Sequence, residues 1–207
     1  MKIKRFVIGM ISTNCYVAHN EETKECLIID PAVYSADIVS YIRSNNLIPQ
    51  AILLTHGHFD HIMGIDGFLN EFPVPVYAHE KEAGLLNDAV LNASAEYGPA
   101  YVFQGADYLK DGQEICLAGM DIQVIYTPGH TIGGCCYYFA AEGVLFSGDT
   151  LFYCSVGRSD FPTGSSSQLI RSVREKLLVL PEDTKVYPGH MAETTIGFEK
   201  KHNPFVA

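Results

Sequence analysis

A cluster of potential metal ligands stands in the segment LLTHGHFDHIMG, residues 53–64. Its histidines and aspartate, His56, His58, Asp60 and His61, lie close together directly after an apolar run. The apolar run predicts a buried strand that ends at the first histidine. Imidazole and carboxylate groups suit Zn²⁺, Fe²⁺ and Mn²⁺, whereas softer metals prefer thiolates. The H-x-H-x-D-H spacing alone is only moderately specific, because short histidine clusters also arise by chance.

Three later segments repeat the pattern of an apolar run, a Pro-Gly or Ser-Gly pair and a ligand-type residue. They are YTPGHTIGG with His130, LFSGDTLF with Asp149 and VYPGHMAET with His190. Glycine at these places lets the backbone turn sharply and approach a neighbouring segment closely. If the strand ends converge, the chain offers five imidazoles and two carboxylates: His56, His58, Asp60, His61, His130, Asp149 and His190.

Seven such ligands are too many for one tetrahedral ion, which takes at most four. They suit two ions about 3.5–4 Å apart that share a bridging carboxylate and a water. In a locally extended segment alternate side chains face the same way, so His56 and His58 can face one ion. Asp60 and His61 then face the other. We therefore predict two divalent metal ions, with Zn²⁺ preferred and Fe²⁺ or Mn²⁺ as alternatives.

The elements that position these residues follow from the hydrophobic pattern. Strands are predicted in residues 2–9, 14–20, 25–32, 49–56, 74–80, 114–130, 135–150 and 184–190, with turns at Gly119 and at Glu142-Gly143. Helices are predicted in residues 35–46 (with Ser35 as N-cap), 62–72, 80–88 and 166–180. Strands outnumber helices and no segment resembles a linker. The fold class expected is therefore α+β, as one domain over residues 1–207.

Residues 89–105 show no clear period and contain Tyr97, Tyr101 and Phe103. This segment is either a lid or substrate-contact loop or a plain surface insertion, and the sequence favours neither.

Composition excludes several classes of partner. The formal charge of −10 and the absence of a basic run argue against nucleic-acid binding. No apolar run approaches the roughly 20 residues of a membrane span, and the apolar stretch at residues 6–11 is short for a signal peptide. The six cysteines form no CxxC pair, which favours reduced thiols. We expect a cytoplasmic protein with a small-molecule substrate, no nucleic-acid partner and no membrane partner.

The sequence resembles the metallo-β-lactamase superfamily, within its glyoxalase II (hydroxyacylglutathione hydrolase) branch. The resemblance lies in LIIDPA, LLTHGHFDHIMG, TPGHTIGG, LFSGDTLFYCSVGRSD and VYPGHMAETTIGFEKKHNPF, which follow the family's order from Asp30 to Phe205. It implies a four-layer αββα sandwich with the metals along one edge of the two sheets. Full-length glyoxalase II enzymes add a helical domain that binds glutathione. This chain stops 17 residues after His190, so we expect a single-domain relative without that C-terminal domain.

The resemblance also implies roles for individual residues. It places His56, His58 and His130 on the first metal, Asp60, His61 and His190 on the second, and Asp149 between them. Asp30 resembles a carboxylate that orients a ligand histidine, although it could also be a plain turn residue before Pro31. Arg158 and Asp160 match a family element near the site, and we expect an ion pair within their loop rather than substrate contact. His19, His79 and His202 match no ligand position.

The function that this resemblance implies is hydrolysis of thioesters such as S-lactoylglutathione. A hydroxide that bridges the two metals would attack the carbonyl beside Asp149, with Asp60 orienting it. One alternative is a persulfide dioxygenase, with a single Fe²⁺ held by His56, His130 and Asp149. Others are a lactonase or another ester or amide hydrolase, and a non-enzymatic metal-holding or interaction module. The presence of the whole second ligand group favours the dinuclear hydrolase.

Overall fold

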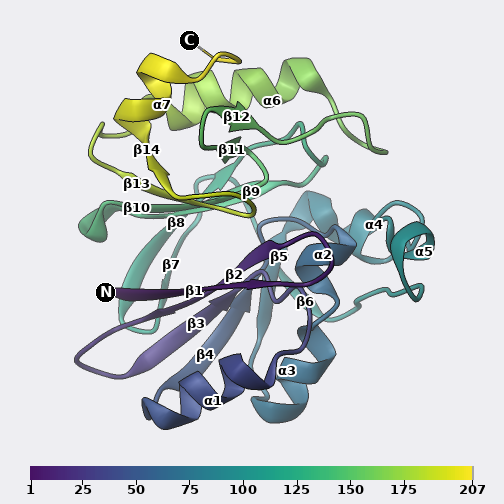
Figure 1. Ribbon diagram of the computed structural model, residues 1–207, viewed down its shortest axis with the longest axis vertical. Coiled ribbons are helices and arrows are strands. Elements are labelled where there is room, and N and C mark those ends of the chain that lie inside the picture. Colours follow the sequence, from purple (N-terminus) through teal and green to yellow (C-terminus); the bar gives the residue numbers. More distant parts are fainter. Residues whose placement is uncertain (207) are drawn as a thin grey trace.

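The chain folds into two six-stranded sheets that pack face to face, with helices on both outer faces (Figure 1). The computed structural model describes residues 1–206. This arrangement is the four-layer αββα sandwich predicted from the sequence.

The first sheet has the order β1-β2-β3-β4-β5-β6, antiparallel from β1 to β3 and parallel from β3 to β6. Its strands are β1 (Lys2–Ile8), β2 (Thr13–His19), β3 (Glu25–Ile29), β4 (Ile48–Leu53), β5 (Val76–His79) and β6 (Ala106–Leu109). The second sheet has the order β14-β13-β10-β9-β8-β7. Its strands are β7 (Glu114–Leu117), β8 (Met120–Tyr126), β9 (Cys135–Phe139), β10 (Val144–Gly148), β13 (Lys185–Pro188) and β14 (Thr194–Thr195).

A separate two-stranded hairpin and short helices complete the fold. The hairpin pairs β11 (Leu151–Phe152) with β12 (Ser155–Val156). Helices α1 (Ala36–Ser44), α2 (Phe59–Ile62) and α3 (Ile65–Glu71) lie on the side of the first sheet, and α6 (Ser166–Ser172) and α7 (Ile196–His202) on the side of the second (Figure 1). Further helical segments are Glu80–Glu82, α4 (Ala83–Leu86), α5 (Ser94–Tyr97), Ala140–Glu142 and the π-helical turn Val173–Leu177.

Alternation of side chains along the strands builds three apolar layers. In β2, Val17 belongs to the cluster under α1 and α3, while Tyr16 belongs to the cluster between the two sheets. In β9, Tyr137 packs between the sheets, while Cys136 packs in the cluster that also contains residues of α6 and α7. Each sheet is therefore buried on both faces, which fixes the register of its strands.

Several predicted local features are confirmed. Ser35 is the N-cap residue of α1, although its side chain makes no capping hydrogen bond. Gly119 and Gly143 both adopt positive φ in the predicted turns, at +67° and +62°.

The single helix predicted for residues 62–72 is wrong. The structure has α2 and α3 instead, separated at Gly64. A side chain at Gly64 would collide with the Pro31 carbonyl, so the segment after β3 packs against the break.

All six cysteines are free, and four of them are buried. No helix within residues 1–206 combines the length and apolarity that crossing a membrane requires.

Candidate metal centre

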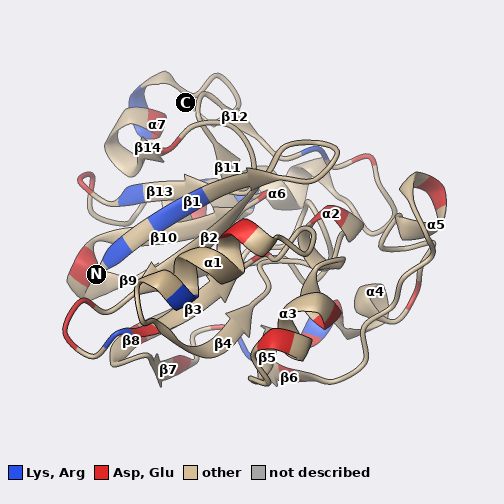
Figure 2. Cartoon of the chain, turned by 60° about the horizontal axis from the view of Figure 1, so that its bottom comes forward, with Lys and Arg blue, Asp and Glu red and all other residues tan. Residues whose placement is uncertain are grey.

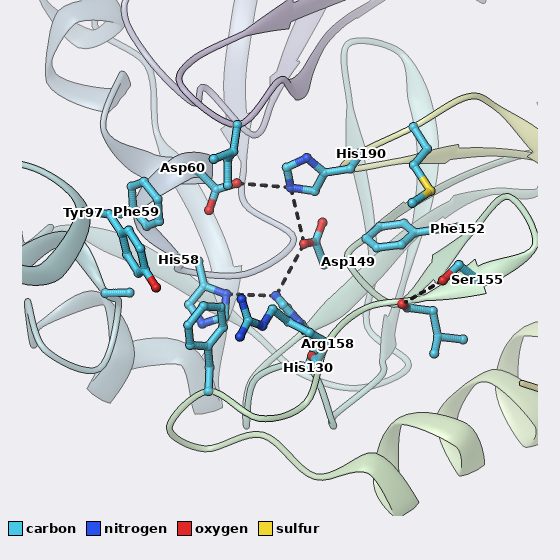
Figure 3. A pocket seen from close by; sticks show the side chains of 15 residues that line it. His58, Phe59, Asp60, Tyr97, His130, Asp149, Phe152, Ser155, Arg158 and His190 are labelled. Carbon is cyan, nitrogen blue, oxygen red and sulfur yellow. Dashed lines mark hydrogen bonds and ion pairs between the residues drawn. The ribbon is translucent and has the colours of Figure 1, made fainter.

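The seven predicted ligands come together where four strands end. His56 and His58 follow β4, His130 follows β8, Asp149 follows β10 and His190 follows β13. Asp60 and His61 lie in α2, which begins directly after His58. Figure 3 shows Asp60, His190, Asp149 and His130 pointing toward one another. These strand ends meet because β4 is parallel to its neighbours in the first sheet and β10 is parallel to β13 in the second.

A glycine allows the two ligand-bearing loops from the two sheets to approach each other. Gly148, which precedes Asp149, has φ +47°, and a side chain there would collide with Thr55. Thr55 in turn precedes His56. The Ser-Gly pair in the sequence is therefore explained by close packing and by a left-handed backbone.

Three imidazoles form the first group of ligand atoms. The His130 Nε2 atom lies 3.2 Å from His56 Nε2 and 2.9 Å from His58 Nδ1. Their side chains are almost fully buried. This is the group that the resemblance assigns to the first metal.

A carboxylate and two imidazoles form the second group. Asp60 Oδ2 lies 3.2 Å from His61 Nε2 and 3.2 Å from His190 Nε2. Asp149 lies between the two groups: its Oδ1 is 3.5 Å from His61, and its Oδ2 is 3.5 Å from both His130 and His190. One carboxylate thus faces ligands of both groups.

Other oxygens hold these side chains in place. Asp30 Oδ2 lies 3.0 Å from His61 Nδ1, and the same carboxylate accepts hydrogen bonds from the Thr55 amide and hydroxyl. His130 Nδ1 donates to the Arg158 carbonyl at 2.7 Å. Each contact occupies one ring nitrogen and leaves the other directed at the cluster, as is usual for metal-binding histidines.

Burial keeps the first group neutral. It lowers the pKa of His56 and His58 well below the ordinary value, and the neighbouring imidazoles lower it further. The pKa of His130 is lowered mainly by the same burial. Neutral imidazole is the form that binds a metal ion.

The second group has the opposite electrostatics. Burial would lower the pKa of His61, but the carboxylates of Asp60, Asp30 and Asp149 outweigh it and raise that pKa well above the ordinary value. Burial likewise opposes ionisation of Asp60, but His61 and His190 hold its pKa well below the usual range. This group therefore attracts positive charge, which a divalent cation would supply.

The donor atoms fit divalent cations. Three sets of ligand atoms lie within 4.8 Å of one another: His56/His58/His130, His56/His61/Asp149 and Asp60/His61/His190. Ligands 2.0–2.1 Å from a tetrahedral zinc ion stand about 3.3 Å apart, which matches the separations described above. In addition, Asp149 Oδ1 is buried and receives no hydrogen bond from any residue that the structure describes.

Arg158 and Asp160 form a bidentate ion pair at the mouth of the site. Two guanidinium nitrogens of Arg158 lie 2.7 Å from the two carboxylate oxygens of Asp160. The guanidinium also lies 3.9 Å from the centre of the Phe161 ring. The pair holds this loop together, and the loop supplies the carbonyl that orients His130.

Glu82 has a structural role that the sequence did not reveal. It is fully buried, and its two carboxylate oxygens accept hydrogen bonds from the Gly57 amide at 2.8 Å and from the Thr131 hydroxyl at 3.2 Å. Gly57 lies between His56 and His58, and Thr131 follows His130. Glu82 therefore ties together the two loops that carry the first ligand group.

A cavity of about 440 Å³ opens beside the ligands. Its walls are formed by Ile11, His58, Phe59, Asp60, Ala93, Tyr97, His130, Asp149, Phe152, Ser155, Val156, Arg158, Phe161, His190 and Met191. Ala93 and Tyr97 belong to the segment 89–105, so this segment contributes to the cavity wall. The remaining histidines, His19, His79 and His202, belong to none of the three ligand sets.

Comparisons with known proteins agree with this geometry. A model of the Metallo-beta-lactamase superfamily matches residues 8–190. The chain is 39% identical to "Probable metallo-hydrolase YqgX" of Bacillus subtilis (strain 168), covering 100% of this chain and 98% of that protein. It is 31% identical to "Hydroxyacylglutathione hydrolase GloC" of Haemophilus influenzae, with the same coverage.

Two solved structures extend the comparison. The crystal structure of "BLEG-1 B3 metallo-beta-lactamase" aligns with a TM-score of 0.94 at 41% identity, covering 99% of both chains. The structure of "TTHA1623 in a di-iron-bound form" aligns with a TM-score of 0.86 at 35% identity, covering 98% of this chain and 99% of that one.

Proposed function

The chain belongs to the metallo-beta-lactamase superfamily and is a metallo-hydrolase of that family, and from this premise we propose that it hydrolyses thioesters with two divalent cations. Zn²⁺ is the preferred cation, with Fe²⁺ or Mn²⁺ as alternatives. The observation that carries the proposal is the complete second ligand group, Asp60, His61 and His190, beside the first. A centre with one ion would leave these three groups, of which His61 is fully buried, without a role.

Two relatives support the two parts of the proposal. GloC, named as a hydroxyacylglutathione hydrolase, supports a thioester such as S-lactoylglutathione as substrate. The di-iron form of TTHA1623 supports a dinuclear centre. Both align over nearly the full length of this chain.

The residues around the cavity have distinct tasks in such a reaction. Asp60 lines the cavity, and its Oδ2 atom is fixed by a hydrogen bond from Thr13 Oγ1 at 2.8 Å. This leaves its other oxygen to accept a hydrogen bond from the attacking water and to orient it. Asp149 keeps the two ligand groups at a fixed separation. The aromatic rings of Phe59, Tyr97 and Phe161 exclude bulk water from one wall.

The cations would polarise the carbonyl and, as zinc does, lower the pKa of a water to about 7 when bound. A thiolate is a good leaving group, so the chain needs no general acid beside the sulfur atom. Besides the ligands and the paired Arg158, the polar side chains of the cavity lining are Tyr97 and Ser155.

A second candidate is hydrolysis of an amide in a β-lactam ring. The specific observation in its favour is the 41% identity and TM-score of 0.94 to the BLEG-1 B3 metallo-beta-lactamase. The same ligand set serves either substrate, because the fold does not fix the substrate. Hydrolysis of a lactone, a cyclic ester, is a related reaction that the same assay can test.

The experiment is a hydrolase assay with the metal content measured in the same samples. We expect the protein to cleave S-lactoylglutathione or a simpler thioester, to lose activity after treatment with a chelator and to regain it with Zn²⁺, Mn²⁺ or Fe²⁺. A β-lactam, a lactone and a persulfide with oxygen uptake complete the panel.

His58→Ala and Asp149→Ala test the ligand assignment. Each variant is expected to lose at least about 10²-fold in activity, since each removes a ligand needed to hold a cation. His202→Ala is the matched control, because His202 is exposed on α7, away from the ligand sets. Full activity in metal-free protein would contradict the proposal.

A further inference from the structure

Beyond the ligands, the cavity wall is largely apolar. Phe59 stacks on Tyr97 with ring centres 5.4 Å apart, and Phe161 packs against the ring of His58 at 5.3 Å. Phe152 lies on the other side of the ligands, opposite Tyr97 (Figure 3), and Met191 also lines the cavity. A molecule that reaches the ligands must therefore pass between apolar side chains.

The lining of this cavity contains no unpaired lysine or arginine. Among the residues that the structure describes, Arg158 is the only Lys or Arg in it. Its guanidinium is already engaged by both oxygens of Asp160 and by the face of Phe161. Glu96 in α5 adds a further negative charge next to Tyr97 and raises the pKa of Arg158 together with Asp160.

The basic residues of the molecule lie elsewhere. Figure 2 shows lysine and arginine along β1 and on β13, whereas α5 contains an acidic residue. Arg5 on β1 donates to the Met191 carbonyl at 3.3 Å but does not line the cavity. Apart from the proposed cations at the ligands, an anionic group at the cavity mouth would thus meet no Lys or Arg of the described lining besides the paired Arg158.

We propose that the preferred substrate is a thioester whose thiol part is uncharged and apolar, rather than one carried on glutathione. The inference rests on the proposed thioesterase function and specifies its substrate class. Glutathione brings two carboxylates and one ammonium group. Desolvating a carboxylate without a partner costs free energy, whereas burying apolar surface against Phe152, Phe161 and Tyr97 releases it.

A series of three thioesters tests this inference. The same lactoyl group is presented on glutathione, on the neutral thiol N-acetylcysteamine and on the neutral, apolar thiol benzyl mercaptan. Each rate is divided by the rate of the uncatalysed hydroxide reaction, which removes differences in leaving-group chemistry. For the metal-loaded enzyme we expect a kcat/KM for the benzyl thioester at least about tenfold above that for the glutathione thioester. The value for the N-acetylcysteamine thioester should lie between the two.

Two variants link the preference to the residues that carry it. Tyr97→Ala removes part of the apolar wall. It is expected to lower, about fivefold, the kcat/KM for the benzyl thioester relative to that for the N-acetylcysteamine thioester. Tyr153→Ala is the control: Tyr153 is also an exposed tyrosine, but it stacks on Phe198 and does not line the cavity, so the ratio stays unchanged. Asp160→Asn releases Arg158. It is expected to raise the kcat/KM for the glutathione thioester relative to that for the N-acetylcysteamine thioester.

The outcomes separate the two levels of the claim. A wild-type preference for the glutathione thioester overturns this inference and leaves the thioesterase function standing. A benzyl preference that Tyr97→Ala and Tyr153→Ala change equally also overturns it, because the preference then does not come from this wall. If the metal-loaded enzyme cleaves none of the three thioesters, the proposed function itself is overturned.

Discussion

At the scale of single residues, three ligand histidines, His56, His61 and His130, each have an oxygen beside the ring nitrogen that points away from the cluster. The Asp30 carboxylate lies beside His61 Nδ1, and the Arg158 carbonyl accepts from His130. The Thr55 hydroxyl, which donates to Asp30, lies 3.2 Å from His56 Nδ1. These contacts select the ring nitrogen that faces the cluster, so the geometry of the ligands is fixed before any ion binds.

Asp30→Asn tests this orientation. The amide keeps the size of the side chain but loses the charge that holds His61. We expect the affinity of the second ligand group for a divalent cation to fall about 10–100-fold. Titration against a chromophoric chelator measures that affinity. Asp37→Asn, which changes an exposed carboxylate in the first turn of α1, serves as the control and should leave the affinity unchanged. Equal affinities for the two variants would count against an orienting role for Asp30.

The sequence revealed the ligand-type residues because each follows an apolar run at a strand end. Glu82 gave no such signal, since it stands in a polar segment and its partners Gly57 and Thr131 are 25 and 49 residues away. The partner of His130 was hidden for another reason: Arg158 contributes a main-chain carbonyl, which any residue type would provide.

At the scale of elements, Glu82 connects the loop after β4 to the loop after β8. Burial raises the pKa of its carboxyl group from 4.5 to about 7, against the hydrogen bonds from Gly57 and Thr131. Because the folded-state pKa lies above the unfolded one, the native state binds the proton more tightly. The contribution to stability is present below pH 4.5 and is lost as the pH rises through 7.

Glu82→Gln removes this titration. The difference in unfolding free energy between wild type and variant should therefore shift against the wild type by on the order of 3 kcal/mol between pH 4.5 and 8. Denaturant unfolding at several pH values measures it, and subtraction of the variant cancels the titration of the histidines. A difference that stays flat over this range would show that Glu82 does not take up a proton on folding.

The break between α2 and α3 is a second feature at this scale. Gly64→Ala places a methyl group against the Pro31 carbonyl and should destabilise the fold by about 1–3 kcal/mol. Gly84→Ala is the matched control, because Gly84 lies in α4 and has no atom within 4 Å of the added group. That variant should be neutral or stabilised by up to about 1 kcal/mol, as helical alanine is. Thermal or denaturant unfolding distinguishes the two, and equal stabilities would contradict the packing explanation.

Elements with strong periodicity were predictable and short ones were not. β2, β3, β4, β8 and β9 combine β-branched, aromatic and other apolar residues, and all are found where the pattern places them. β6, whose sequence is ADYL, is half exposed and is a strand because β5 pairs with it in parallel. The helix expected over 62–72 is divided by packing against Pro31, a contact that no local pattern encodes.

At the scale of the whole molecule, the layer order brings four strand ends to one edge. The hydrophobic pattern predicted an α+β fold, and the resemblance of the ligand motifs to the metallo-β-lactamase superfamily implied the αββα sandwich, which the structure shows. The proposed substrate preference could not be predicted, since the cavity wall combines residues as distant in sequence as Ile11, Tyr97 and Met191. The pairing of Arg158 with Asp160, by contrast, was expected from the sequence and is present in the structure.

The number of cations held by the intact chain tests the central claim most directly. Native mass spectrometry of the protein loaded with Zn²⁺ should show two ions per chain for the wild type. His58→Ala and His190→Ala, which each disrupt one ligand group, should each show one. A wild-type chain that saturates with a single ion, or with none, would contradict the account of a dinuclear centre.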